Sequence, residues 1–141
     1  MDPFEAIKKE RKTGKLFCGA GKRVDTVGKA AASFGLSDDE KLYRETDMEM
    51  ARAIVVNVLH RDLAYGNRLI SLGRAEELAS QVMQRFAQGG SRYFTNAEFK
   101  HGAAAALVLS RWDPATNATF DTGVIILGAA ETGCVWVADE D

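Results

Sequence analysis

The sequence has few of the residue types on which many specialised folds and sites depend. Of its 141 residues, two are cysteine, two are proline and two are histidine. Two cysteines are too few for a disulfide framework. No apolar run reaches the roughly 18 residues of a membrane-spanning helix, and the opening MDPFEAIKKERK lacks the apolar core of a signal peptide. We therefore expect a cytoplasmic protein with reduced thiols, although a single Cys18–Cys134 bridge stays open.

The composition is that of an ordinary globular domain, with 46% hydrophobic and 27% charged residues. A chain of this length is most simply one domain, residues 1–141. Its net charge of −2 gives no strong attraction to nucleic acid or to a membrane. The charge is uneven, because residues 1–36 hold eight Lys and Arg against four acids. The role of this basic segment stays open.

The last 30 residues reverse that balance, with six acids and no Lys or Arg. Because they include a strand hairpin, we expect a rigid acidic rim that holds Asp121 in place, with a loose tip at 139–141. Such a surface suits a basic partner, and an aromatic residue beside acids is typical of a binding hot spot. The candidate partner-binding residues are therefore Asp121, Trp136, Asp139, Glu140 and Asp141.

Helix signals dominate the first two thirds of the chain. Asp2 and Pro3 predict a helix start, and residues 1–14 would form a peripheral helix or a mobile arm that stops at Gly14. A second helix is expected over about 26–34. Apolar residues at helical spacing predict two stronger helices, from about 47 to 64 and from about 72 or 74 to Gly89.

After Gly90 the apolar spacing becomes that of strands. The candidate strands are 92–95, 103–112, 119–127 and 134–137, with a turn over 113–117. The segment 16–22 is interpreted as a glycine-rich turn. Helices followed by antiparallel strands predict an α+β fold, in which N-terminal helices pack on a C-terminal antiparallel sheet of three or more strands.

Residues 60–67, HRDLAYGN, match the spacing of a protein-kinase catalytic loop. A kinase also needs a glycine-rich lid, a strand lysine and a separate metal-binding Asp, and these do not stand in order here. We interpret Asp62 as part of a helix tail, with Tyr65 and Gly66 as a helix stop packed against the body. A small enzyme remains an alternative, using Asp62, His60 or Tyr93 in a pocket between the helices and the sheet.

The remaining motifs are weaker. Gly19-Ala-Gly-Lys22 lacks the flanking residues of a Walker loop, and weak anion binding by Lys22 and Arg23 stays open. Residues 31–37 resemble the turn of a helix-turn-helix, but the acids at 38–40 would repel DNA. A DNA-linked regulator is thus a second alternative. We expect no metal or other cofactor, because neither His60 nor His101 has a partner at metal-ligand spacing.

Five short segments together resemble small bacterial immunity proteins of contact-dependent inhibition and other polymorphic toxin systems. They are LAYG (63–66), YFTN (93–96), WDP (112–114), TFDTGV (119–124) and WVADED (136–141). The resemblance covers roughly residues 60–141. It implies a non-enzymatic inhibitor whose partner is a cognate toxin domain, such as a nuclease. The identity of that partner and the oligomeric state stay open.

Overall fold

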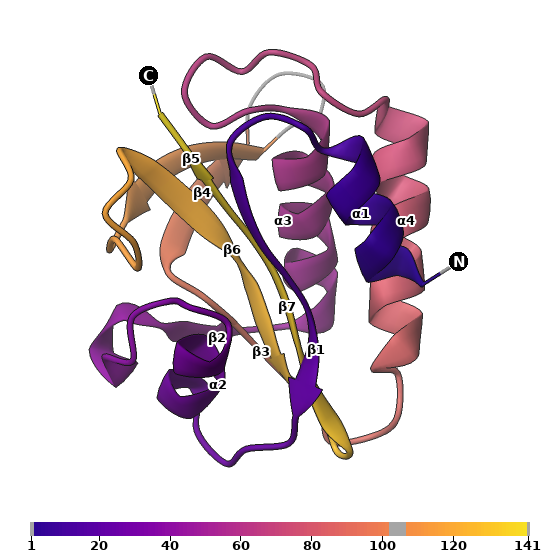
Figure 1. Ribbon diagram of the computed structural model, residues 1–141, viewed down its shortest axis with the longest axis vertical. Coiled ribbons are helices and arrows are strands. Elements are labelled where there is room, and N and C mark those ends of the chain that lie inside the picture. Colours follow the sequence, from indigo (N-terminus) through magenta and orange to yellow (C-terminus); the bar gives the residue numbers. More distant parts are fainter. Residues whose placement is uncertain (1, 102–106, 141) are drawn as a thin grey trace.

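The computed structural model describes residues 2–101 and 107–140 (Figure 1). Within these residues the helices are α1 (Pro3–Glu10), α2 (Val27–Ser33), the 3-10 helix η1 (Glu40–Leu42), α3 (Met48–His60) and α4 (Leu72–Arg85). The strands are β1 (Lys15–Lys22), β2 (Arg44–Thr46), β3 (Arg92–Thr95), β4 (Ala97–His101), β5 (Leu107–Trp112), β6 (Phe120–Leu127) and β7 (Glu131–Asp139). The predicted α+β class is confirmed.

The main sheet has five antiparallel strands in the order β1-β7-β6-β3-β2, and β4 and β5 form a separate hairpin. The expected hairpin of β6 and β7 lies at its centre and pairs Phe120 with Asp139. The simple division into N-terminal helices and a C-terminal sheet is wrong, because β1 and β2 come from the N-terminal half. The glycine-rich segment predicted as a turn is the strand β1.

Both faces of the sheet are covered, so the molecule has two hydrophobic cores. Helices α1, α3 and α4 pack on one face, where β6 and β7 supply Val124, Ile126, Val135 and Val137. Helix α2 and the segment after it cover the other face, around Trp136. Each central strand is therefore buried almost throughout.

The two cysteines belong to different cores. Cys18 packs against the core on the side of α1, and Cys134 lies in the core under α2. Their side chains thus point to opposite faces of the sheet, and both thiols are free. This geometry excludes the disulfide that the sequence left open.

Helix α1 is not an arm. Its Phe4 and Ile7 are buried, and the Phe4 ring packs edge-on against Phe86 with 6.4 Å between the ring centres. Asp2 accepts a hydrogen bond from the amide of Phe4, as the sequence predicted for the helix start. None of the helices in 2–101 and 107–140 has both the length and the apolar character that a membrane crossing demands.

Gly123 provides a test of this sheet. A Cβ on Gly123 would lie 2.1 Å from the carbonyl oxygen of Val135 on the neighbouring strand. We expect Gly123→Ala to lower the free energy of unfolding by about 2–3 kcal/mol, measured by urea denaturation. Gly73 is the matched control, since it lies in α4 with no atom within 4 Å of an added Cβ. Gly73→Ala is expected to stabilise by about 0.5–1 kcal/mol, and equal effects of the two substitutions would contradict the packing described here.

Candidate functional site

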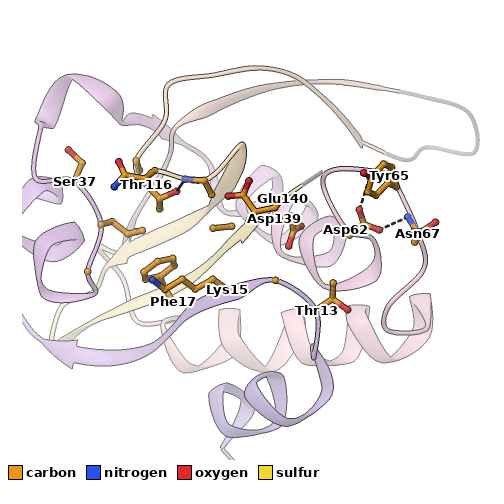
Figure 2. A pocket seen from close by; sticks show the side chains of 17 residues that line it. Thr13, Lys15, Phe17, Ser37, Asp62, Tyr65, Asn67, Thr116, Asp139 and Glu140 are labelled. Carbon is orange, nitrogen blue, oxygen red and sulfur yellow. Dashed lines mark hydrogen bonds between the residues drawn. The ribbon is translucent and has the colours of Figure 1, made fainter.

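A hollow of about 910 Å³ lies where β1 begins and β7 ends. Five segments line it, namely 13–17, 35–37, 62–67, 115–118 and 138–140. In Figure 2 the loop of Asp62 and Tyr65 lies at one end of the hollow, Ser37 and Thr116 lie at the other, and Phe17 lies between them. The hollow contains three of the acids singled out from the sequence, so the partners of each carboxylate decide what the site can do.

Asp62 organises the loop that follows α3. Its Oδ1 accepts a hydrogen bond of 2.6 Å from the amide of Tyr65, and its Oδ2 accepts one of 2.8 Å from the amide of Asn67 (Figure 2). The carboxylate therefore ends the helix at His60, earlier than the predicted position near residue 64. Gly66 completes the turn with a φ of 70°. Since both oxygens bind backbone amides, Asp62 has a structural role in this loop.

Tyr65 is exposed at the surface, contrary to the prediction from the sequence. It was expected to pack against the body, but 68% of its surface is exposed. It stands at the edge of the hollow on the loop that Asp62 holds. The sequence does carry signals for a turn here, because Asp and Gly are both turn-forming residues.

Asp139 is buried, so the expectation of a loose acidic tip is wrong at this position. Its exposed fraction is 2%. Arg11 donates to both carboxylate oxygens at 3.2 and 2.9 Å, and the amide of Leu63 donates to Oδ2 at 2.8 Å. Arg11 also donates from Nε to the carbonyl of Val58 in α3. Gly14, with a φ of 76°, lets the chain pass over this ion pair, because a Cβ there would lie 2.0 Å from Asp139 Oδ1.

Asp121 is also internal, which corrects its expected place on an acidic rim. Its exposed fraction is 0%. Five donors surround its carboxylate, namely Asn96 Nδ2, the amides of Ala115 and Thr116, Thr116 Oγ1, and Trp136 Nε1. These bonds fasten the 113–119 turn and the start of β4 to the sheet. Asp121 and Trp136 are therefore core residues that a partner does not reach in this conformation.

Glu140 is the one candidate partner-binding residue in the described part of the chain that is exposed. Its carboxylate accepts hydrogen bonds from the amide and the hydroxyl of Thr119. It lines the hollow next to Asp139, between Thr116 and the loop of Tyr65 (Figure 2). Asp141, the last of the candidates, lies outside the described residues.

The residues considered for a small enzyme do not converge. Asp62 lines the hollow, whereas Tyr93 lies in the core beneath α3 and α4. The Nδ1 atom of His60 lies 2.7 Å from the carbonyl oxygen of Ile70 and is held there. Burial raises the pKa of Cys18 to about 12, so this thiol is unsuited to act as a nucleophile.

The described residues contain no group of three or more His, Cys, Asp and Glu side chains placed to hold a metal ion. The side chain of His101, which has no partner at metal-ligand spacing in the sequence, lies outside the described part. Comparison with family models, with curated proteins and with solved structures finds no match to this chain.

The buried ion pair gives a direct test of this geometry. We expect Arg11→Met to lower the free energy of unfolding by about 3–5 kcal/mol, because Asp139 would stay buried without its cation. Arg11→Met combined with Asp139→Leu is expected to recover most of that loss, as measured by urea denaturation. Arg74→Met is the control, since the Arg74–Glu10 pair at 2.7 Å is partly exposed and its loss should cost at most about 1 kcal/mol. Equal losses for the two single variants would mean that Arg11 and Asp139 are not coupled in the interior.

Proposed function

We propose that this chain is a non-enzymatic immunity-type protein that binds and neutralises a cognate bacterial toxin domain in the cytoplasm. The observation that carries the proposal is that the carboxylates inside the hollow are held by structural hydrogen bonds. Its two interior carboxylates, Asp62 and Asp139, are fully used by amides and by Arg11. A general acid or base needs a carboxylate that is free to exchange a proton with a substrate, and these two have fixed structural partners instead.

What the hollow offers is a contact surface. Tyr65 presents an exposed aromatic ring at one side, and the half-buried Phe17 provides apolar surface within it. Aromatic side chains of this kind carry much of the binding energy at protein interfaces. Because hydrogen bonds to Asp62 already fix the loop of Tyr65, the loop loses little conformational entropy when a partner binds. These features favour recognition of a protein surface.

The charge that would attract a basic toxin begins next to the hollow, after Ser37, and continues away from it. The segment 38–49 holds six exposed acids against Lys41 and Arg44. It follows Ser37, which lines the hollow, and Glu140 adds a further exposed carboxylate. Complementary charge of this kind raises the association rate with a basic partner. The acidic surface is thus proposed at 38–49 and Glu140, in place of the buried Asp121 and Asp139.

Tyr65→Ala tests the contact surface. The partner to use is the toxin domain encoded immediately upstream of this reading frame, co-expressed in bacteria and co-purified with the tagged protein. We expect roughly 10- to 100-fold weaker binding and loss of growth protection, because an anchor aromatic is removed. Leu72→Ala is the control, since Leu72 is similarly exposed at 50% and does not line the hollow. Equal protection by the two variants would show that the surface is wrong, and no protection by the unaltered protein would show that the function is wrong.

Glu140→Lys tests the electrostatic part of the proposal. We expect the association rate with the same toxin domain to fall several-fold at low ionic strength and to approach that of the unaltered protein at high salt. Stopped-flow or surface-based kinetics measure this rate. Glu76→Lys makes the same charge change on an exposed face of α4, outside the hollow. A similar slowing by Glu76→Lys would assign the effect to net charge alone.

A further inference from the structure

Strand β1 leaves one long edge of the sheet open. It is the outermost strand on its side, and it pairs with β7 over all eight of its residues, from Lys15 with Ala138 to Lys22 with Glu131 (Figure 1). Among the described residues, its backbone makes no backbone hydrogen bond other than those within the sheet. In an antiparallel edge strand, roughly half of the amide and carbonyl groups point away from the neighbour. β1 therefore presents a row of unpaired donors and acceptors.

A groove of about 620 Å³ runs beside this edge along residues 18–22. Its walls come from α1, from the end of α2 at Ser33 and Phe34, and from Arg85. The middle of the strand is small, being Gly19, Ala20 and Gly21, and no atom lies within 4 Å of where a Cβ on Gly19 would stand. There is thus space beside the main chain for the side chains of an added strand.

The two ends of β1 carry the charges that select an occupant. Lys15 and Lys22 are exposed, and neither forms an ion pair with any residue in 2–101 or 107–140. The other cations that line the groove already form ion pairs, Lys8 with Glu5 and Arg85 with Glu131. If two copies paired β1 with β1 about a two-fold axis, Lys15 of one copy would oppose Lys22 of the other. Like charges directly opposite destabilise such a pair, and edge lysines are a common protection against self-association.

We propose that β1 docks an extended acidic segment of another protein, which joins the sheet as a further antiparallel or parallel strand. Main-chain hydrogen bonds to β1 hold the segment, and two carboxylates that flank its uncharged centre lie beside Lys15 and Lys22. These lysines are seven positions apart, which places them on opposite faces of the strand and roughly 23 Å apart along it. The bound segment therefore carries its carboxylates seven positions apart as well, one toward the α1 side and one toward the α2 side. This surface shares Lys15 with the hollow, whereas the rest of it, along residues 18–22, lies in the separate groove.

The experiment uses the full chain and a synthetic peptide, acetyl-Glu-Val-Thr-Val-Thr-Val-Thr-Glu-amide, so its outcome does not depend on any toxin. Amide hydrogen exchange of residues 15–22 is measured by NMR while the peptide is added. At peptide concentrations well above the dissociation constant, we expect the β1 amides that do not bond to β7 to exchange at least about ten-fold more slowly, because they gain a hydrogen-bonded partner strand. No added protection of β1 at millimolar peptide would overturn the proposal.

A charge exchange then tests the specificity. The double variant Lys15→Glu and Lys22→Glu is expected to bind the same peptide roughly ten-fold more weakly and to prefer a version with lysine at both ends. The control is Lys9→Glu with Lys12→Glu, which changes the net charge equally at exposed residues outside the groove, and it should keep the preference for the acidic peptide. An equal loss in the control would reduce the effect to net charge. Concentration-dependent dimers in sedimentation, with the same β1 amides protected, would replace the acidic segment by a second copy.

Discussion

The buried ion pair between Arg11 and Asp139 is the interaction on which the arrangement of this molecule depends. It joins residues that are 128 positions apart, at the end of the first helix and the end of the last strand. Two charges taken out of water are costly unless each is fully paired. Here Arg11 also donates to α3 and Asp139 accepts a hydrogen bond from the amide of Leu63, so bonds to two further parts of the chain offset the cost. This one pair therefore holds the end of β7 against the loop of Tyr65, and both line the hollow.

The sheet explains why the buried polar groups lie where they do. Because helices cover one face and the α2 region covers the other, the middles of β6 and β7 have no contact with water and are almost entirely apolar. Polar side chains on these strands stand near their ends, where loops bring donors to them. Asp121 near the start of β6 and Asp139 at the end of β7 are the two buried acids of these strands, and each receives several donors. The same end of the sheet consequently holds both the fastened loops and the hollow.

The elements with local patterns could be predicted from the sequence, and those set by distant contacts could not. Helices α3 and α4 show a helical apolar period, and β6 and β7 show strand-forming runs with a turn between them, so each was predicted within a few residues. The strand β1 was missed because Gly19 and Gly21 resemble a turn, whereas β7 supplies the hydrogen bonds that make it extended. The acidic end was misplaced for a related reason. An Asp at position 139 gives no local sign that its cation is Arg11, so a charge count alone predicts a surface.

The proposal of binding in place of chemistry follows from the fixed partners of the carboxylates in the hollow. A catalytic group must change its protonation or its contacts during a reaction, and each of these carboxylates would break bonds that hold a loop or a helix in place. A binding surface has the opposite requirement, since every side chain already ordered before contact reduces the entropy lost on association. The Tyr65 loop meets this requirement, because the backbone is fixed by Asp62 while the ring stays in solvent. Under the proposed function, the hydrogen bonds that make the site rigid are the same ones that suit Asp62 and Asp139 to a structural role.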